Sequence, residues 1–98
     1  MSIPADIKDF VLASFPAHQQ DSALERLAKA TLHDGTVPGP RTLRCATYAG
    51  RGDIDKLEYY INLLCIDYRD VIVAGEYDVV DGKLVRVRNL TDSFPSRT

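Results

Sequence analysis

Two groups of polar side chains in this chain could carry chemistry. The denser group lies between positions 67 and 77 and consists of Asp67, Arg69, Asp70, Glu76 and Tyr77. Carboxylates beside a guanidinium and a phenol are the kinds of group that acid–base catalysis uses. No histidine is near them in sequence, and Cys65, the one nearby nucleophile, falls on a helix face that we expect to be core. We therefore predict that these residues cap and join two helices, and we predict no catalytic residues.

The second group is basic and has helical spacing. Arg41, Arg44 and Tyr48 are at positions i, i+3 and i+7, so a helix would present them on one face. Two guanidiniums and an aromatic ring can hold phosphates or stack on a base. The net charge of −2 and the pI near 5.5 argue against a nucleic-acid-binding domain, which is usually basic. Weak nucleic-acid or anion binding through this face stays open as the alternative function.

Charge is distributed unevenly along the chain. Residues 35–51 carry a net charge of +3, residues 52–82 carry −6, and residues 83–98 carry +3. The simplest interpretation is that the basic segments pack beside the acidic one and neutralise it within the molecule.

Metal and cofactor chemistry is not expected. The two histidines are isolated, the two cysteines form no CxxC motif, and no glycine-rich phosphate loop is present. Cys45 and Cys65 each lie in a largely apolar, helical context, where a reduced cysteine acts as a small hydrophobe. The N-terminus is acidic and has no apolar signal region, and no apolar run could span a membrane. These features favour a cytosolic protein without a membrane partner.

The elements that would position these groups follow from apolar periodicity. It predicts helices over residues 4–15, 21–33, 41–50 and 53–68, and Asp21 and Asp53 are suitable N-caps for the second and the fourth. After them, the β-branched run at 71–73 and the Asp81-Gly82 turn favour strands. By propensity alone, residues 71–88 would form a β-hairpin.

The predicted helix from Asp53 to Tyr68 has two apolar faces. The broader face consists of Ile54, Leu57, Tyr60, Ile61, Leu64, Cys65 and Tyr68. The second consists of Tyr59, Leu63 and Ile66, at i, i+4 and i+7. A surface helix needs only one apolar face, so this helix is either buried inside the domain or presents its second face to a partner. Burial within one chain and burial in a dimer both remain possible at this stage.

Two stretches of the chain follow a recognisable pattern: Arg41-Thr42-Leu43-Arg44-Cys45-Ala46 running into Gly52-Asp53-Ile54-Asp55-Lys56-Leu57, and Asp67-Tyr68-Arg69-Asp70-Val71-Ile72 ending in Glu76-Tyr77. They resemble a group of small, functionally uncharacterised bacterial proteins with a G-D-L-x-x-L … D-Y-R-D-V-L-x-x-A-E-Y pattern. The resemblance covers about residues 41–78 and implies helix beyond Tyr68. Gly75 departs from the pattern and costs a helix about 1 kcal/mol relative to alanine. The resemblance implies no activity.

Together these observations predict a mainly α domain of four or five helices, with a fifth helix at about 68–77 and a short C-terminal β-hairpin at 78–88. The alternative is an α+β fold with the longer hairpin at 71–88. We expect one domain over residues 1–90 and an irregular tail over 91–98. The expected function is a non-enzymatic interaction module, forming a homodimer or binding a protein partner through Tyr59, Leu63 and Ile66.

Overall fold

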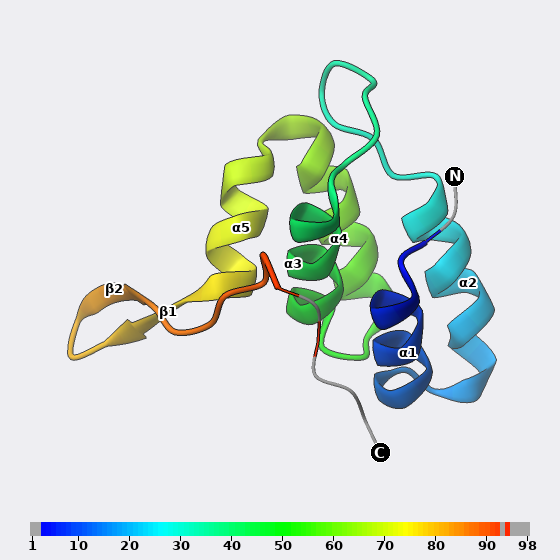
Figure 1. Ribbon diagram of the computed structural model, residues 1–98, viewed down its shortest axis with the longest axis horizontal. Coiled ribbons are helices and arrows are strands. Elements are labelled where there is room, and N and C mark those ends of the chain that lie inside the picture. The colour runs from blue at the N-terminus through cyan, green and yellow to red at the C-terminus, as the bar shows by residue number, and fades with distance from the viewer. Residues whose placement is uncertain (1–2, 93, 95–98) are drawn as a thin grey trace.

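The computed structural model describes residues 3–92 and 94 of the 98-residue chain. Five helices precede a two-stranded antiparallel hairpin, which confirms the mainly α fold with a short C-terminal hairpin (Figure 1). The elements are α1 (Ala5–Ser14), α2 (Ala17–Ala28), α3 (Pro40–Gly50), α4 (Ile54–Ile66), α5 (Tyr68–Glu76), β1 (Tyr77–Val80) and β2 (Lys83–Arg86). The longer hairpin at 71–88 is wrong, because residues 71–76 belong to α5.

Helix α3 is the central element of the bundle. It packs against α5, α4 and α1, and Figure 1 shows it in the middle of the helical layer. Contact on several sides explains why residues of different helical faces are buried on it, among them Leu43, Cys45, Ala46, Thr47 and Ala49. The two-faced helix α4 instead lies beside α3, between α5 and α2. The bundle therefore covers most of the broad face, although Cys65 and Tyr68 at its end stay exposed, and it leaves part of the other face in solvent.

Gly75 explains how a β-branched segment became a helix. A Cβ atom built on Gly75 would lie 2.6 Å from both the Cα and the Cβ of Cys45. Glycine therefore lets α5 approach α3 more closely than any other residue could, and the packing gained offsets its low helix propensity. Gly75 weakens the prediction of a helix by its low propensity, yet it is the residue that lets α5 pack closely on α3.

We expect Gly75→Ala to destabilise the protein by roughly 1–3 kcal/mol, because backbone atoms of α3 would have to move. Helix propensity alone predicts a gain of about 1 kcal/mol, so the sign of the change separates the two effects. Gly39→Ala is a control for space alone, since a Cβ there meets nothing within 4 Å, and as the N-cap of α3 it should lose only the small preference of that position for glycine over alanine. Urea unfolding of the three proteins measures this. Stabilisation by Gly75→Ala would contradict the close contact.

Of the two N-caps predicted from the sequence, the structure confirms one and contradicts the other. Asp53 caps α4 as predicted, because its carboxylate accepts hydrogen bonds from the N–H groups of Asp55 and Lys56. Asp21 is not a cap, and that prediction is wrong. Helix α2 begins at Ala17, directly after Pro16, whose ψ of 146° separates it from α1. The proline that ends one helix thus also starts the next.

The C-terminal segment belongs to the core beyond the predicted boundary at residue 90. Leu90 and Phe94 are both buried with the helical core, and the Phe94 ring stacks on Phe10 of α1 with ring centroids 4.3 Å apart. Of the predicted tail at 91–98, only residues 91, 92 and 94 lie within the described part of the chain. The described residues after β2, 87–92 and 94, form no regular helix or strand, and Leu90 and Phe94 among them pack on the bundle.

Candidate interaction surfaces

Glu76 is the centre of a buried ion network that joins α3, α5 and the hairpin. Its carboxylate is fully buried and accepts two hydrogen bonds from Arg41, Nε to Oε2 at 3.0 Å and Nη2 to Oε1 at 2.7 Å. Arg86 donates from Nε to Oε1 at 3.1 Å, and the N–H of Leu90 donates to Oε2 at 3.0 Å. One carboxylate therefore fixes the base of β2 and the segment after it against two helices.

A second ion pair lies on the same side of α3. Arg44 is buried, and its Nε donates to Oδ2 of Asp6 at 2.8 Å, while its Nη1 donates to the carbonyls of Leu90 and Thr91. The N–H of Phe94 donates to the same oxygen of Asp6 at 3.1 Å. These contacts attach the C-terminal segment to both α1 and α3.

Tyr48 completes this face through an interaction with the C-terminal segment. The guanidinium carbon of Arg88 lies 4.3 Å from the centroid of the Tyr48 ring, at a distance typical of a cation–π contact. Arg88 also donates from Nη1 to the carbonyl of Gly75 at 2.8 Å. The predicted face of Arg41, Arg44 and Tyr48 therefore exists as one face, and each of its three side chains contacts another part of the same chain.

Hydrogen bonds lower the pKa of both carboxylates in these pairs. For Glu76, the hydrogen bonds from Arg41 are the main cause and outweigh the effect of burial. For Asp6, burial raises the pKa, but the hydrogen bonds from Arg44 and from the Phe94 amide together bring it below its usual value. Both groups stay ionised near neutral pH, which suits a structural ion pair better than a proton-transfer role.

The charged residues between positions 67 and 77 are divided between the two ends of α5 in the structure. Asp67 caps α5 by accepting from the N–H of Arg69, and the two side chains form an ion pair at 3.1 Å. This confirms the capping role predicted for them. Glu76 is at the other end of α5, in the buried network, and Asp70 is exposed. The structure therefore does not bring the carboxylates together around one reacting position.

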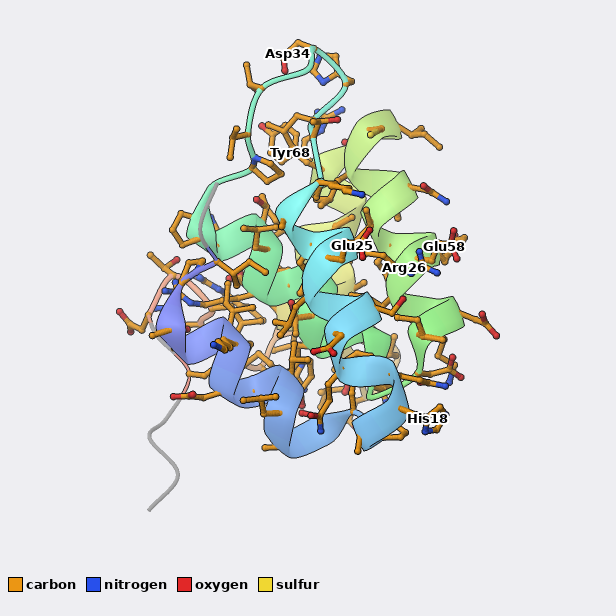
Figure 2. The ribbon with its side chains drawn as sticks, turned by 90° about the vertical axis from the view of Figure 1, so that its right-hand side faces the viewer. His18, Glu25, Arg26, Asp34, Glu58 and Tyr68 are labelled. Atoms are coloured by element: carbon orange, nitrogen blue, oxygen red, sulfur yellow. The ribbon has the colours of Figure 1, made fainter. Side chains whose placement is uncertain are left out.

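A shallow pocket of about 330 Å³ lies where α4 meets α5. Figure 2 shows Tyr68 beneath the loop whose tip carries Asp34. The pocket combines apolar, aromatic and charged side chains, and its lining consists of His33, Ile66, Asp67, Tyr68 and Arg69. Within this lining, Asp67 and Arg69 already form an ion pair with each other. Its chemistry does not select a ligand class.

The two cysteines differ in environment, which corrects the prediction that Cys65 lies on a core face. Cys45 is buried, whereas Cys65 is exposed and donates from Sγ to the carbonyl of Thr31 at 3.1 Å. Cys65 lies at the margin of the broad face of α4, where the adjacent loop covers it incompletely. Both thiols are free in the structure.

We expect one of the two thiols to react with a thiol reagent in the native protein. Burial, followed by the negative charge of Glu76, raises the pKa of Cys45 to about 12, so its reactive thiolate is scarce. Cys65 is exposed and should be modified alone. Titration with a chromogenic disulfide, before and after adding urea, counts the reacting groups. If both thiols react in the absence of urea, the contact between α3 and α5 around Cys45 must open readily.

Among the residues that the structure describes, no group of three or more histidine, cysteine, aspartate or glutamate side chains could hold a metal ion. None of the helices in the described ranges is long and apolar enough to cross a membrane.

The second face of α4 is partly open to solvent. Tyr59 is 61% exposed and Ile66 is 75% exposed, while Leu63 between them is partly buried and packs against the core. The Tyr59 ring also contacts the Tyr60 ring edge to face, with centroids 5.1 Å apart. The predicted strip therefore exists as two exposed apolar positions separated by a half-covered one.

The hairpin is the larger exposed apolar surface. It projects from the end of α5 away from the helical bundle (Figure 1). Val79 is 67% exposed and Leu84 is 58% exposed, and these two residues face each other across the strands. Three more valines, Val80, Val85 and Val87, are also exposed on or next to the hairpin. Two exposed apolar surfaces, on α4 and on the hairpin, are thus available for contact.

The hairpin was predicted as an element but not as a contact surface, and the central position of Glu76 in the ion network was not predicted. The unequal charge of the segments was the available signal. The Arg41–Glu76 and Arg86–Glu76 pairs join both basic segments to the acidic one, as the charge distribution predicted.

Comparison with known proteins found no matching family model, curated protein or solved structure.

Proposed function

We propose that the protein is a non-enzymatic protein-interaction module whose principal contact element is the C-terminal hairpin. The observation that carries this proposal is the exposure of five apolar side chains on and beside a ribbon that projects from the bundle: Val79, Val80, Leu84, Val85 and Val87. Burying one valine or leucine side chain completely is worth about 1.5–3 kcal/mol. A partner that covers this ribbon would therefore gain a substantial contact energy.

The attachment of the hairpin supports a presenting role. Arg86, in β2, is bonded to the buried Glu76, and the N–H of Val87 donates to the carbonyl of Glu76 at 2.9 Å. The base of the ribbon is thus fixed by the ion network, and its apolar part extends beyond it. A fixed orientation lowers the entropy cost of binding. The ion network would serve this function as a support for the contact surface.

The exposed positions Tyr59 and Ile66 on α4, with Leu63 between them, form a second contact surface in this proposal. Its support is weaker, because Leu63 already packs on the core. The alternative of anion binding through Arg41, Arg44 and Tyr48 has less support still, since both arginines contact carboxylates of the chain itself. The proposed location is the bacterial cytosol, where the unpaired cysteines would stay reduced.

Photo-crosslinking in the cells that make the protein tests the proposal. A benzophenone amino acid replaces Leu84 on the hairpin, Tyr59 on α4, or Leu12, which is 46% exposed on α1 and serves as the control. We expect a protein adduct from position 84 and none from position 12. An adduct from position 59 alone would move the contact to α4. Equal labelling at all three positions, or at none, would contradict an interaction module.

A further inference from the structure

The hairpin has one protected edge and one open edge. Asp81 and Gly82 have φ values of 52° and 77°, which are those of a two-residue type I′ turn. In such a hairpin the residues next to the turn, Val80 and Lys83, bond to each other, and the direction of the backbone polar groups alternates along each strand. The N–H and C=O groups of Leu84 therefore point outward from β2, and those of Val79 point outward from β1.

Donors on the outer edge of β1 are already bonded. The N–H of Tyr77 donates to the carbonyl of Val73 in the last turn of α5. The N–H of Val79 donates to Oδ1 of its neighbour Asp78 at 3.0 Å. A strand that approached this edge would have to break both bonds.

The outer edge of β2 is different. Within residues 3–92 and 94, no group accepts from the N–H of Leu84 or of Arg86. All four residues of β2 are exposed, and Figure 1 shows the ribbon projecting away from the helices. An isolated two-stranded hairpin is marginally stable in water, whereas three or more strands support one another. This edge is therefore suited to the addition of a further strand.

We propose that β2 pairs in antiparallel orientation with β2 of a second copy of this chain, with Leu84 opposite Leu84 across a twofold axis. The two hairpins then form one four-stranded sheet in the order β1-β2-β2-β1. This inference rests on the proposed function and names the partner of the same hairpin surface. A strand pairing with its own copy about a twofold axis is the simplest closed assembly.

The side chains of this register are self-complementary on both faces of the sheet. Val79 is opposite Leu84 within each hairpin, so the register creates a continuous row of Val79, Leu84, Leu84 and Val79 across the four strands. On the other face, Lys83 is opposite Val85 of the second copy. Asp78, the partner of that Val85, comes next in the row, so the Lys83 amine approaches an opposite charge. No like charges are directly opposed.

The neighbouring registers fit less well. A shift of one residue puts Lys83 opposite Arg86, and it also sets outward-pointing backbone groups against inward-pointing ones, so both charge and hydrogen bonding oppose it. A shift of two residues puts Leu84 opposite Arg86 and Lys83 opposite Val87. The first change interrupts the apolar row of Val79 and Leu84 with a charged side chain. The Leu84 register is thus favoured by its own side chains.

Sedimentation of the full chain from about 10 µM to about 1 mM tests the pairing, since an interface this small implies micromolar or weaker affinity. We expect a monomer–dimer equilibrium. Leu84→Pro removes the N–H that points away from β1 but removes no hydrogen bond between β1 and β2. This variant should therefore be monomeric. Val79→Pro makes the same change on the protected edge and should still dimerise. Helical circular dichroism confirms that each variant is folded.

A disulfide provides an independent measure if a proline variant fails to fold. Hydrogen-bonded residues directly opposite each other have Cα atoms about 5.5 Å apart, which is within the range of a disulfide. In a Cys65→Ser background, Leu84→Cys should therefore oxidise rapidly to a covalent dimer. Val79→Cys lies on the same face, but two strands separate it from its copy, so it should not.

A wild-type protein that stays monomeric at the highest concentration would overturn the pairing, as would equal oxidation of the two cysteine variants. These outcomes separate the inference from the function on which it rests. Monomeric protein together with a specific photo-adduct from position 84 would retain the interaction module and reject the second copy as its partner. Monomeric protein without any adduct would reject both.

Discussion

Glu76→Ala should lower the free energy of unfolding by roughly 2–4 kcal/mol, because it leaves two guanidiniums and a buried amide without their acceptor. The affected groups are Arg41, Arg86 and the N–H of Leu90. We expect this loss of stability to be smaller than the loss from breaking a fully buried ion pair. The side chains of Arg41 and Arg86 are each 41% exposed, so water can hydrate them in the variant. Urea unfolding followed by circular dichroism measures it.

Glu25→Gln is the control for this variant. Glu25 also accepts from a cation, Lys29 at 2.8 Å, but both side chains are largely exposed. Its replacement should leave the urea midpoint unchanged, because exposed ion pairs contribute little. If the two variants unfold at the same urea concentration, the buried network does not stabilise the fold, and its proposed role in supporting the hairpin is lost as well.

The pH dependence of stability should report on the same carboxylate. The hydrogen bonds from Arg41 hold the pKa of Glu76 in the folded protein below its ordinary value of 4.5. The unfolded chain therefore takes up this proton at a higher pH than the folded protein does. The contribution of Glu76 is complete above the unfolded pKa and is lost as the pH falls toward the folded pKa. The stability gap between wild type and Glu76→Gln should accordingly narrow below about pH 5.

Exchange of backbone amides should connect this network to the proposed contact surface. The hairpin is joined to the bundle through Arg86, through the backbone bond between Val87 and Glu76, and through the end of α5. In Glu76→Gln we expect faster hydrogen exchange at Val80 and Lys83, while amides in α1 and α2 keep their protection. Unchanged exchange in the hairpin would mean that the backbone connection alone orients it.

Local signals were sufficient to predict most of the architecture. Helical periodicity, the Asp53 cap and the Asp81-Gly82 turn each act within a few residues, and the structure has the corresponding elements. Val71 and its β-branched neighbours were ambiguous because their helical state depends on α3, which is about 30 residues earlier in the chain. The close contact between Gly75 and Cys45 favours the helix, and no local pattern contains that contact.

The candidate surfaces were predictable to a lesser degree. The spacing of Arg41, Arg44 and Tyr48 correctly placed them on one face, but periodicity cannot identify which distant groups cover a face. Here the covering groups come from α1, α5 and the segment after β2. The hairpin was not predicted as a contact surface for a related reason. Alternating apolar residues such as Val79 and Leu84 usually imply a covered strand face, and only the three-dimensional arrangement shows that nothing in the described chain covers them.

Leu64→Ala should destabilise the protein by roughly 2–5 kcal/mol, because truncating a fully buried leucine removes apolar contacts and leaves a cavity. Ile61, one turn earlier on α4, is only partly buried against the core, so Ile61→Ala should cost less. Ile66→Ala should change stability by no more than about 0.5 kcal/mol, since that side chain is 75% exposed. Denaturant unfolding of the three variants at low protein concentration measures this order.

This series distinguishes the two apolar faces of α4, because the three residues have similar chemistry and differ mainly in burial. A large effect at position 64 with a negligible one at position 66 assigns the broad face to the core and leaves the second face available to a partner. A large loss of stability in Ile66→Ala at low concentration would mean that the second face is covered within the chain. The α4 strip would then no longer be a candidate contact surface, and the hairpin alone would carry the proposed function.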